Sequence, residues 1–406
     1  MMISYHTCPL ASQEGKETGG MNIYVLELSK ALIKKGYIVD VYTRIQDIIG
    51  PEIVELMQNF RIIHIPAGPK KFVIKKQLLK YIDIFSLNLY SFICRNHISY
   101  DVIHAHYYMS GITAEYLKEK GVSKQIVMTF HTLALMKNLV SRSSSERESN
   151  RRITIEKKLI KNTSIITASS EADKEYLTHL YSCPEEKISI VNPGIDPKVF
   201  HPIPKLEARE YIQSVTRDKL LLYVGRIEPL KGIDVLMHAL KILSNKYPFL
   251  KLRLLIVGGN ESSVNKELIR LKKIEKNLQI KPIVGYISQR NQHELPYYYN
   301  AAELVVMPSY YESFGMTALE AMACGTPVII TDTSGISRLF DKELSSLIVS
   351  TNNPLQLAGQ IEKAVSDIRF INRYKQKVQL LLQHMTWNDV ASHISTIYNN
   401  IFIQNK

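Results

Sequence analysis

Two glutamates in the sequence, Glu312 and Glu320, have the spacing and the setting of a ligand site. They lie in PSYYESFGMTALEAMACGTPVI, residues 308–329, where a β-rich run ends and a helix is predicted to begin near Gly315 or Met316. The free N–H groups and partial positive charge of a helix N-terminus bind phosphate. A carboxylate can accept hydrogen bonds from two vicinal hydroxyls of a sugar or ribose. The segment therefore predicts a site for one extended ligand, although isolated glutamates are more often surface or ion-paired residues.

Two cations, Arg226 and Lys231, occupy a second candidate segment, YVGRIEPLKGIDVL, residues 223–236. They follow a predicted strand and are five residues apart across a turn that leads into a helix. Fixed positive charges at such a turn suit a diphosphate and would stabilise a departing nucleotide in the transition state. Either cation alone would be interpreted as a helix cap or a surface charge.

Two further features lie in the first half of the chain. Gly19 and Gly20 stand at a predicted loop-to-helix junction, where glycine lets the backbone approach a phosphate or sugar closely. His131, in TFHTLA, follows a predicted strand at its carboxyl end. A glycine pair is weak evidence by itself, and a lone histidine is more often a structural residue.

The elements that must position these residues form two successive α/β sets. Alternating strands and helices predict parallel sheets with crossover helices, here two doubly wound, Rossmann-like domains that face each other across a ligand cleft. The predicted strands of the first set are MMISYH, YIVDVYTR, RIIHIPA, DVIHAHY and QIVMTFHT, with helices from Gly20 to Lys35, from Lys76 to Asn96 and from Gly111. Those of the second are LLLYVGR, LRLLIVGG, PIVGYI, ELVVMPS and PVIITD, with helices from Ile233, Val264, Leu295, Met316 and Pro354.

The division into domains is predicted from a proline- and glycine-rich stretch, residues 191–204, which we expect to be a linker. It separates an N-terminal domain, 1–190, from a C-terminal domain, 205–386. Apolar residues at helical spacing predict an amphipathic helix over 387–406.

The net charge of +13 indicates an anionic partner such as nucleic acid, a membrane surface or a phosphorylated substrate. The excess is concentrated in the first half. Residues 61–80 hold six Lys and Arg without one acid, and residues 137–161 hold eight against three glutamates. A solvated basic face remains an alternative for most of these residues.

The location predicted from composition is the cytoplasm. The four cysteines are far apart, with no CxxC pair or metal-ligand cluster, which fits a reducing compartment. The sequence MMISYH lacks the features of a signal peptide, and no apolar run approaches the roughly 20 residues of a membrane span.

Taken together, the segment around Glu312 and Glu320 resembles the E-x7-E signature of the retaining GT-B glycosyltransferases of the group 1, family 4 type, which use sugar nucleotides. The resemblance implies that Glu312 contacts the donor sugar and Glu320 the ribose. Arg226 and Lys231, in a GRxxxxKG pattern, would bind the diphosphate. The backbone groups implied to bind sugar and diphosphate are those of Gly19, Gly20, Ser313, Phe314, Gly315 and Met316.

Other motifs narrow the resemblance. HTxPL, GGMNxYV, AGP, HxHYxxSG, TFHTLALMKN and NPGID follow in the order found in the inositol-phosphate N-acetylglucosaminyltransferases of mycothiol synthesis and, more distantly, in sucrose-phosphate synthases. That similarity places Asn22 and His131 near the transferred sugar, with Asn22 on the acceptor side. The residues implied around an acceptor phosphate are Lys75, Tyr107, Thr132 and one of Arg151 or Arg152. It also implies that the terminal helix packs back on the first domain.

The mechanism that the family implies needs no enzyme nucleophile. The acceptor hydroxyl attacks from the face that the nucleotide leaves, and catalysis is positioning and electrostatics by His131, Glu312, Arg226 and Lys231. The co-substrate would be a UDP-sugar. No Asp-x-Asp pair of the metal-dependent type occurs, so neither a catalytic metal nor another cofactor is expected.

Three functions remain open at this point. The first is transfer of a hexose or N-acetylhexosamine to a soluble, phosphorylated polyol or sugar. The second is synthesis of an envelope or capsular glycan at the inner face of the membrane, with residues 70–80 on anionic lipid. The third is a catalytically silent sugar-nucleotide-binding protein, against which the intact motifs argue. A homodimer is an open possibility, and no nucleic-acid partner is expected.

Overall fold

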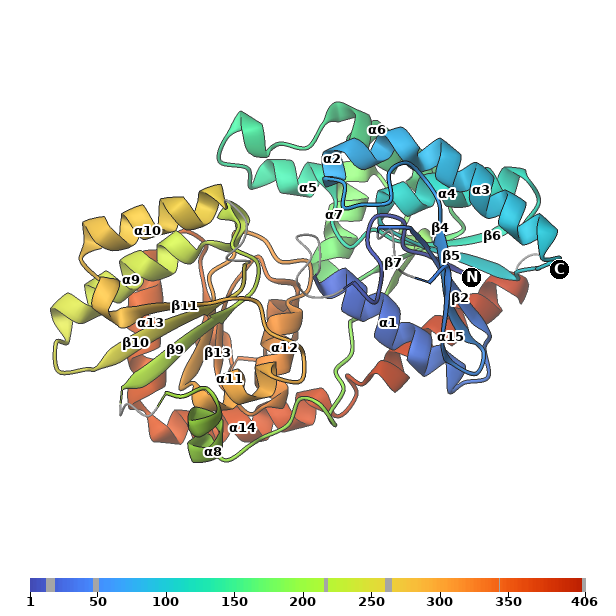
Figure 1. The fold of residues 1–406 in the computed structure, drawn as a ribbon. Helices are drawn as coiled ribbons and strands as arrows, with labels where there is room; N and C mark the ends of the chain where they lie inside the picture. Colours follow the sequence, from blue (N-terminus) through green and yellow to red (C-terminus); the bar gives the residue numbers. More distant parts are fainter. Residues whose placement is uncertain (12–18, 47–50, 215–217, 260–264, 343, 404–406) are drawn as a thin grey trace. The chain divides into compact units, whose positions relative to one another are not determined.

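The computed structural model describes residues 1–11, 19–46, 51–214, 218–259, 265–342 and 344–403. They form two compact units. The first contains residues 1–193 together with 387–406, and the second contains residues 194–386 (Figure 1). The boundary between the units falls at Pro193 and Gly194, within the predicted linker. Within the described part of the chain, no helix is long and apolar enough to cross a membrane.

The sheet of the first unit has the strand order β3-β4-β2-β1-β5-β6-β7-β8. Neighbours are parallel except β3, which pairs antiparallel with β4 at the edge. Every residue of β2, β5 and β6 is buried, as expected of strands that helices cover on both faces. The strands are β1 (Met2–Ile3), β2 (Val39–Arg44), β3 (Ile53–Met57), β4 (Phe60–Ile65), β5 (Val102–His106), β6 (Gln125–Thr129), β7 (Ile165–Ala168) and β8 (Ile188–Ile190).

The helices of this unit include one from the far end of the chain. The terminal helix α15 (Trp387–Ile403) lies beside α1 (Gly20–Ile33), and the Tyr37 and Ser395 hydroxyls are 2.6 Å apart (Figure 1). The other helices are α2 (Lys75–Leu78), η1 (Leu79–Tyr81), α3 (Ile82–Arg95), α4 (Tyr107–Glu119), α5 (Ala134–Leu139), η2 (Ser144–Glu146), α6 (Asn150–Asn162), α7 (Glu171–Tyr181) and η3 (Glu185–Lys187).

The second unit has a six-stranded sheet, parallel throughout, in the order β11-β10-β9-β12-β13-β14. Its strands are β9 (Lys219–Val224), β10 (Leu252–Val257), β11 (Val284–Ile287), β12 (Leu304–Met307), β13 (Val328–Thr331) and β14 (Ile348–Val349). Its helices are α8 (Lys205–Tyr211), η4 (Pro229–Lys231), α9 (Ile233–Lys246), α10 (Lys266–Leu278), η5 (Lys281–Ile283), α11 (Leu295–Ala301), α12 (Met316–Ala323), η6 (Gly335–Leu339), η7 (Ser345–Leu347), α13 (Pro354–Ser366) and α14 (Ile368–Leu382).

Three predicted helices differ from the observed ones. The helix predicted over 76–96 is interrupted by the tighter turn η1, where the Tyr81 ring packs so closely on Gly68 that a Cβ there would lie 2.5 Å from it. The helix predicted from Gly111 begins at Tyr107, directly after β5. The helix predicted from Val264, which lies outside the described residues, begins at Lys266, where the Asn265 side chain caps two free N–H groups.

Candidate active site

In the second unit, glycines allow the segments that follow β9, β10 and β12 to approach closely. A Cβ at Gly232, where φ is +64°, would lie 2.0 Å from the Pro308 carbonyl oxygen. A Cβ at Gly258 would lie 1.9 Å from the Gly225 oxygen. Since no side chain fits at these contacts, glycine is required there to bring the carboxyl ends of three neighbouring strands together.

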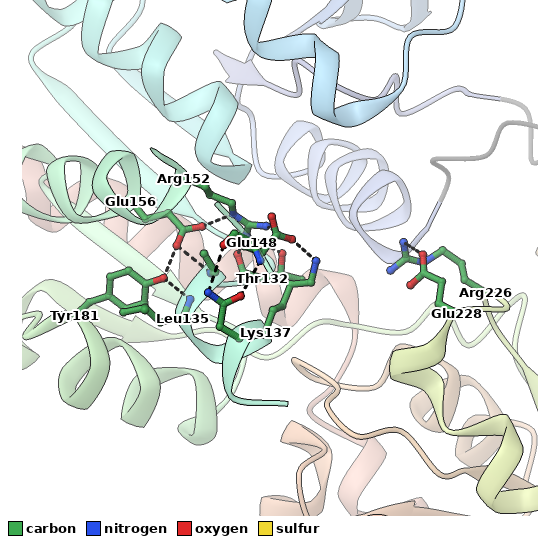
Figure 2. Close-up of polar contacts among 11 residues, drawn as sticks. Thr132, Leu135, Lys137, Glu148, Arg152, Glu156, Tyr181, Arg226 and Glu228 are labelled. Carbon is green, nitrogen blue, oxygen red and sulfur yellow. Dashed lines mark hydrogen bonds and ion pairs between the residues drawn. The ribbon is translucent and has the colours of Figure 1, made fainter. Parts of the chain in front are cut away.

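This packing joins two of the predicted donor-site residues. Lys231, the last residue of η4, donates a hydrogen bond from Nζ to Glu312 Oε2 at 2.5 Å. Both side chains are mostly buried. Lys231, predicted to bind the diphosphate, is therefore adjacent to Glu312, predicted to bind the sugar. The diphosphate and the sugar are likewise adjacent in a nucleotide sugar. Arg226 is more exposed, and its Nη1 donates to Glu228 at 2.8 Å (Figure 2).

The loop from Ser313 to Gly315 leads into α12, which begins at Met316 as predicted. Gly315, before the first turn, has a φ of +109°. The segment after β13 holds this loop, because the Ile336 amide donates to the Phe314 carbonyl at 2.8 Å. The Gly335 amide likewise donates to the Glu312 carbonyl at 3.0 Å. The helix N-terminus and the Glu312 carboxylate thus belong to one braced segment.

Glu320 is a residue of α12, and its side chain is buried rather than exposed to solvent. Its Oε2 accepts a hydrogen bond from the Tyr299 hydroxyl at 2.6 Å. Burial raises the pKa of Glu320 to about 7, and the tyrosine hydrogen bond opposes that shift. The carboxyl therefore changes charge near neutral pH. Tyr299, on α11, was not among the predicted site residues.

In the first unit, two bulky residues at strand ends have left-handed backbones. Tyr107, directly after β5, has a φ of +75°, and His131, two residues after β6, has a φ of +60°. Such conformations are strained for residues with large side chains and concentrate at functional sites. The two residues follow neighbouring strands of the sheet, β5 and β6.

Two of the predicted acceptor-site residues, Lys75 and Arg152, lie over the ring of a third, Tyr107. Lys75 Nζ, from α2, lies 4.0 Å from the ring centroid, and Arg152 Cζ, from α6, lies 4.9 Å from it. Arg152 Nη2 also donates to the Thr132 carbonyl at 2.8 Å and to its hydroxyl at 3.2 Å. Cations over an aromatic face are stabilised by the ring quadrupole. The structure thus gathers Lys75, Tyr107, Thr132 and Arg152, which we call the acceptor cluster.

Of the two arginines left open by the sequence, Arg152 belongs to this cluster and Arg151 is exposed on α6. Arg152 is only 2% exposed and donates from Nε to Glu156 at 2.7 Å. Its Nη1 lies 2.9 Å from Glu148 Oε1, so two carboxylates are paired with the guanidinium. These carboxylates fix the orientation of a buried guanidinium beside the Tyr107 ring, and arginine is well suited to bind anionic groups.

The residues that hold Arg152 were missed by the sequence reasoning (Figure 2). Glu156 also accepts from the Ala134 amide at 2.9 Å and from the Tyr181 hydroxyl, while Glu148 is bonded to Lys137 as well. A signal was available, because Glu148, Arg152 and Glu156 are four residues apart. Charges at that spacing lie on one helix face.

Asn22 uses its side chain to hold the chain around the start of α1. Its Nδ2 donates to the Thr7 hydroxyl and the Cys8 carbonyl, both at 2.6 Å, and its Oδ1 accepts from the Gly19 amide at 3.2 Å. Gly19 has an extended backbone that any residue could adopt, and a Cβ there would meet no described atom within 4 Å. Gly20 is the first residue of α1.

His131 is held from one side by another histidine. Its Nε2 lies 3.1 Å from Nδ1 of His106, and the Tyr24 ring meets it edge-on at 5.2 Å. Burial lowers the pKa of His131 to about 3, with a smaller contribution from Lys75. The residue is therefore neutral at physiological pH. It lines a small pocket at the ends of β6 and β7 together with Thr132, Ser169 and Asp173.

Among the described residues, no group of three or more His, Cys, Asp and Glu side chains is arranged to hold a metal ion. No disulfide joins any two of the four cysteines, all of which lie in the described part of the chain.

Two Rossmann-like units with mainly parallel sheets give the chain the GT-B fold of glycosyltransferases. Residues 205–380 match the family described as "Glycosyl transferases group 1", and residues 18–199 match "Glycosyltransferase Family 4". The chain belongs to the group 1 glycosyltransferases.

Similar proteins cover nearly the whole chain. A D-inositol 3-phosphate glycosyltransferase of Corynebacterium glutamicum (strain R) is 31% identical over 98% of this chain and 96% of its own. The protein of that name from Corynebacterium jeikeium (strain K411) is 34% identical over 90% and 88%. Among solved structures, sucrose-phosphate synthase from Thermosynechococcus elongatus superposes with a TM-score of 0.89, at 28% identity over 99% and 98% of the two chains.

Proposed function

We propose that this glycosyltransferase transfers a hexose or N-acetylhexosamine from a UDP-sugar to a hydroxyl of a phosphorylated polyol or sugar, with retention at the anomeric carbon. Inositol phosphate is the first acceptor to test. The observation that carries the proposal is the acceptor cluster, in which Lys75 and the buried Arg152 lie against one tyrosine ring.

The acceptor phosphate is supported by charge and by hydrogen-bonding capacity. Lys75 supplies an ammonium over the Tyr107 ring, and Arg152 supplies a buried guanidinium held by the carboxylates of Glu148 and Glu156. The Thr132 hydroxyl adds a polar group beside it. The relatives are named for an inositol phosphate acceptor, which agrees with this chemistry.

The donor side is supported by the junction between Lys231 and Glu312. A sugar diphosphate places an anionic phosphate next to a ring with hydroxyls, and this pair offers a cation and a carboxylate at contact distance. In the proposed complex Lys231 turns to the diphosphate while Glu312 accepts hydrogen bonds from the sugar. Arg226 adds charge near the leaving group, and Glu320 is proposed to accept from the ribose.

In the proposed reaction the acceptor oxygen forms the new bond to the anomeric carbon as the bond to the diphosphate breaks, both on one face of the sugar. The hydroxyl proton passes to the departing phosphate oxygen. Catalysis then depends on holding the two substrates together and on neutralising the leaving diphosphate, which preorganised charges do without reorganisation. His131 is proposed to orient the sugar.

The test is a panel of nucleotide sugars incubated with inositol 1-phosphate, inositol 3-phosphate, fructose 6-phosphate and unphosphorylated inositol, with products identified by mass spectrometry. We expect transfer to a phosphorylated acceptor and little to inositol. The anomeric configuration, measured by NMR, should equal that of the donor. Equal rates with inositol would contradict the phosphate pocket, and an inverted product would contradict retention.

A second candidate function has an observation of its own. The hydrophobic Phe72 and Ile74 are 40% and 52% exposed among the lysines of residues 70–80, a combination that fits the surface of an anionic bilayer. An enzyme that builds an envelope glycan on a lipid acceptor would need such a surface. Sedimentation with phosphatidylglycerol vesicles at low and high salt decides this, since absence of binding at low salt removes the candidate.

A further inference from the structure

Two histidines on β5 lie behind His131 in the first unit. His104 and His106 are two residues apart on the strand and both fully buried, so they face the same side and their rings stack with centroids 4.3 Å apart. His106 Nδ1 lies 3.1 Å from His131 Nε2. His104 instead contacts the Tyr398 hydroxyl of α15 at 2.7 Å and the Thr129 hydroxyl at 2.8 Å.

The contact between His106 and His131 joins two neutral rings. Burial lowers the pKa of His131 to about 3 and that of His106 well below its usual range. A neutral imidazole has one nitrogen that donates and one that accepts. One ring must therefore donate its proton and the other must accept it, which leaves two arrangements.

The second ring nitrogen of His106, Nε2, distinguishes the two possible proton arrangements. His106 Nε2 is buried and has no hydrogen-bond partner in the described structure. If His131 donated, the proton of His106 would sit on that nitrogen, as a buried N–H without an acceptor. If His106 donates, the nitrogen is a bare lone pair. Because orphaned buried N–H groups are rarer than under-satisfied acceptors, the second arrangement is favoured.

We propose that His106 is a positioning residue for the transferase reaction, which donates its Nδ1 proton to His131 Nε2 and fixes His131 as the neutral Nδ1–H tautomer. His131 then offers an N–H group, rather than a lone pair, to a sugar oxygen. This inference rests on the proposed role of His131 at the donor sugar. A hydrogen bond at one imidazole nitrogen determines the protonation of the other.

The contact with His106 can fix the ring of His131, whose backbone is strained. With a φ of +60°, the residue follows a tight bend after β6, and its ring needs a fixed partner to have one orientation. His106 provides that partner from inside the sheet, while Tyr24 packs edge-on against the ring. No solvent-exposed group is needed to orient the histidine.

The direct test is nitrogen-15 NMR of the full-length protein labelled at histidine, with His131 assigned by its absence in His131→Asn. We expect Nδ1 of His131 to be protonated and Nε2 to be unprotonated. The opposite pattern overturns the proposal. This measurement needs no substrate, so it is independent of the proposed function.

The kinetic test compares two substitutions at one position. His106→Phe keeps a ring for stacking but removes the donor, and should lower kcat by roughly 10- to 100-fold with UDP affinity unchanged. His106→Asn places an amide N–H near the position of Nδ1 and should restore most of the loss. An unaltered kcat in His106→Phe, or a folded His106→Asn no better than it, overturns the proposal.

His104→Phe is the matched control. It lies in the same stack and loses two hydrogen bonds, so its melting temperature should fall, but the nitrogen-15 pattern of His131 should not change. The nitrogen-15 signals of His131 should change in His106→Phe, which lacks the donor. If they changed equally in His104→Phe, the effect would be one of general packing, and the proposal would be wrong. A fully active His131→Ala, by contrast, would refute the proposed role of His131 alone.

Discussion

At the scale of single residues, the acceptor cluster is organised by Tyr107, whose ring contacts both Lys75 and Arg152. The two cations differ in what holds them. Arg152 is fixed by the Glu156 carboxylate and by Thr132, whereas Lys75 is at the start of the four-residue helix α2. Lys75 can therefore be removed with less effect on folding, which makes it the better probe of substrate binding.

Lys75→Ala should raise the KM for the phosphorylated acceptor by roughly 10- to 100-fold, the value of one charge-assisted hydrogen bond. The dissociation constant of UDP, measured by calorimetry, should not change. Lys76→Ala is the control, since Lys76 is the exposed neighbour on the same helix. Equal KM values for the wild type and Lys75→Ala would remove Lys75 from the phosphate site.

Glu320 makes stability depend on pH. Its pKa is raised from 4.5 to about 7 in the folded protein, so the folded state binds the proton more tightly than the unfolded state does. The contribution of the protonated Glu320 carboxyl to the free energy of unfolding is complete below the unfolded pKa. It is lost as the pH rises through about 7. Since one pKa unit corresponds to about 1.4 kcal/mol, roughly 3 kcal/mol is involved.

The measurement for Glu320 is urea unfolding of the wild type and Glu320→Gln at several values between pH 5 and pH 8. Relative to Glu320→Gln, the wild type should lose unfolding free energy as the pH rises. A constant difference would show that Glu320 titrates in its usual range. Glu320→Ala should also weaken UDP binding, and unchanged UDP affinity would contradict the ribose assignment.

At the scale of elements, the sequence predicted best the helices whose starts are marked by glycine or proline. Those at Ile233, Met316 and Pro354 begin where expected, after Gly232, after Gly315 and at the proline itself. The edge strand β3 was missed. Most of its residues are exposed, so no apolar alternation marks it.

The site was predicted less completely, because the sequence does not show which side chains are buried or which distant residues come into contact. Glu148 and Glu156 had a visible four-residue spacing from Arg152, but nothing in the spacing shows that Arg152 is buried. His106 lay inside a recognised motif. Its effect on His131 depends on a contact across neighbouring strands and on a buried, unpaired nitrogen, neither of which composition reveals.

Gly232 provides a test of how the strand ends are packed. Gly232→Ala should destabilise the second unit by roughly 2 kcal/mol or more, because the backbone is left-handed and the new Cβ would clash with the Pro308 carbonyl. It should also weaken UDP binding by displacing Lys231.

Gly359→Ala is the opposite case and serves as the control. Gly359 is exposed within α13, and a Cβ there meets nothing within 4 Å. Alanine should stabilise the helix by about 0.5 to 1 kcal/mol. Both free energies come from urea denaturation, and a neutral Gly232→Ala would contradict the close approach of these segments.

At the scale of the whole molecule, the chain passes from the first unit to the second at residue 193 and returns at residue 386. The first unit therefore includes α15, whose apolar face contributes buried residues such as Trp387 and Ile394. Trp387 meets the Tyr24 ring of α1, and Tyr398 reaches His104 in the sheet. The core of the first unit is incomplete until this last helix has packed.

This chain path predicts which part of the protein responds to a change in α15. Ile394 is fully buried, so Ile394→Ala should destabilise the first unit by roughly 2 to 5 kcal/mol, while Ser392→Ala, exposed on the same helix, should have little effect. UDP, proposed to bind the second unit, should raise only that unit's melting temperature. In calorimetry, Ile394→Ala should lower the transition that UDP does not move. A shift confined to the UDP-sensitive transition would show instead that α15 stabilises the second unit.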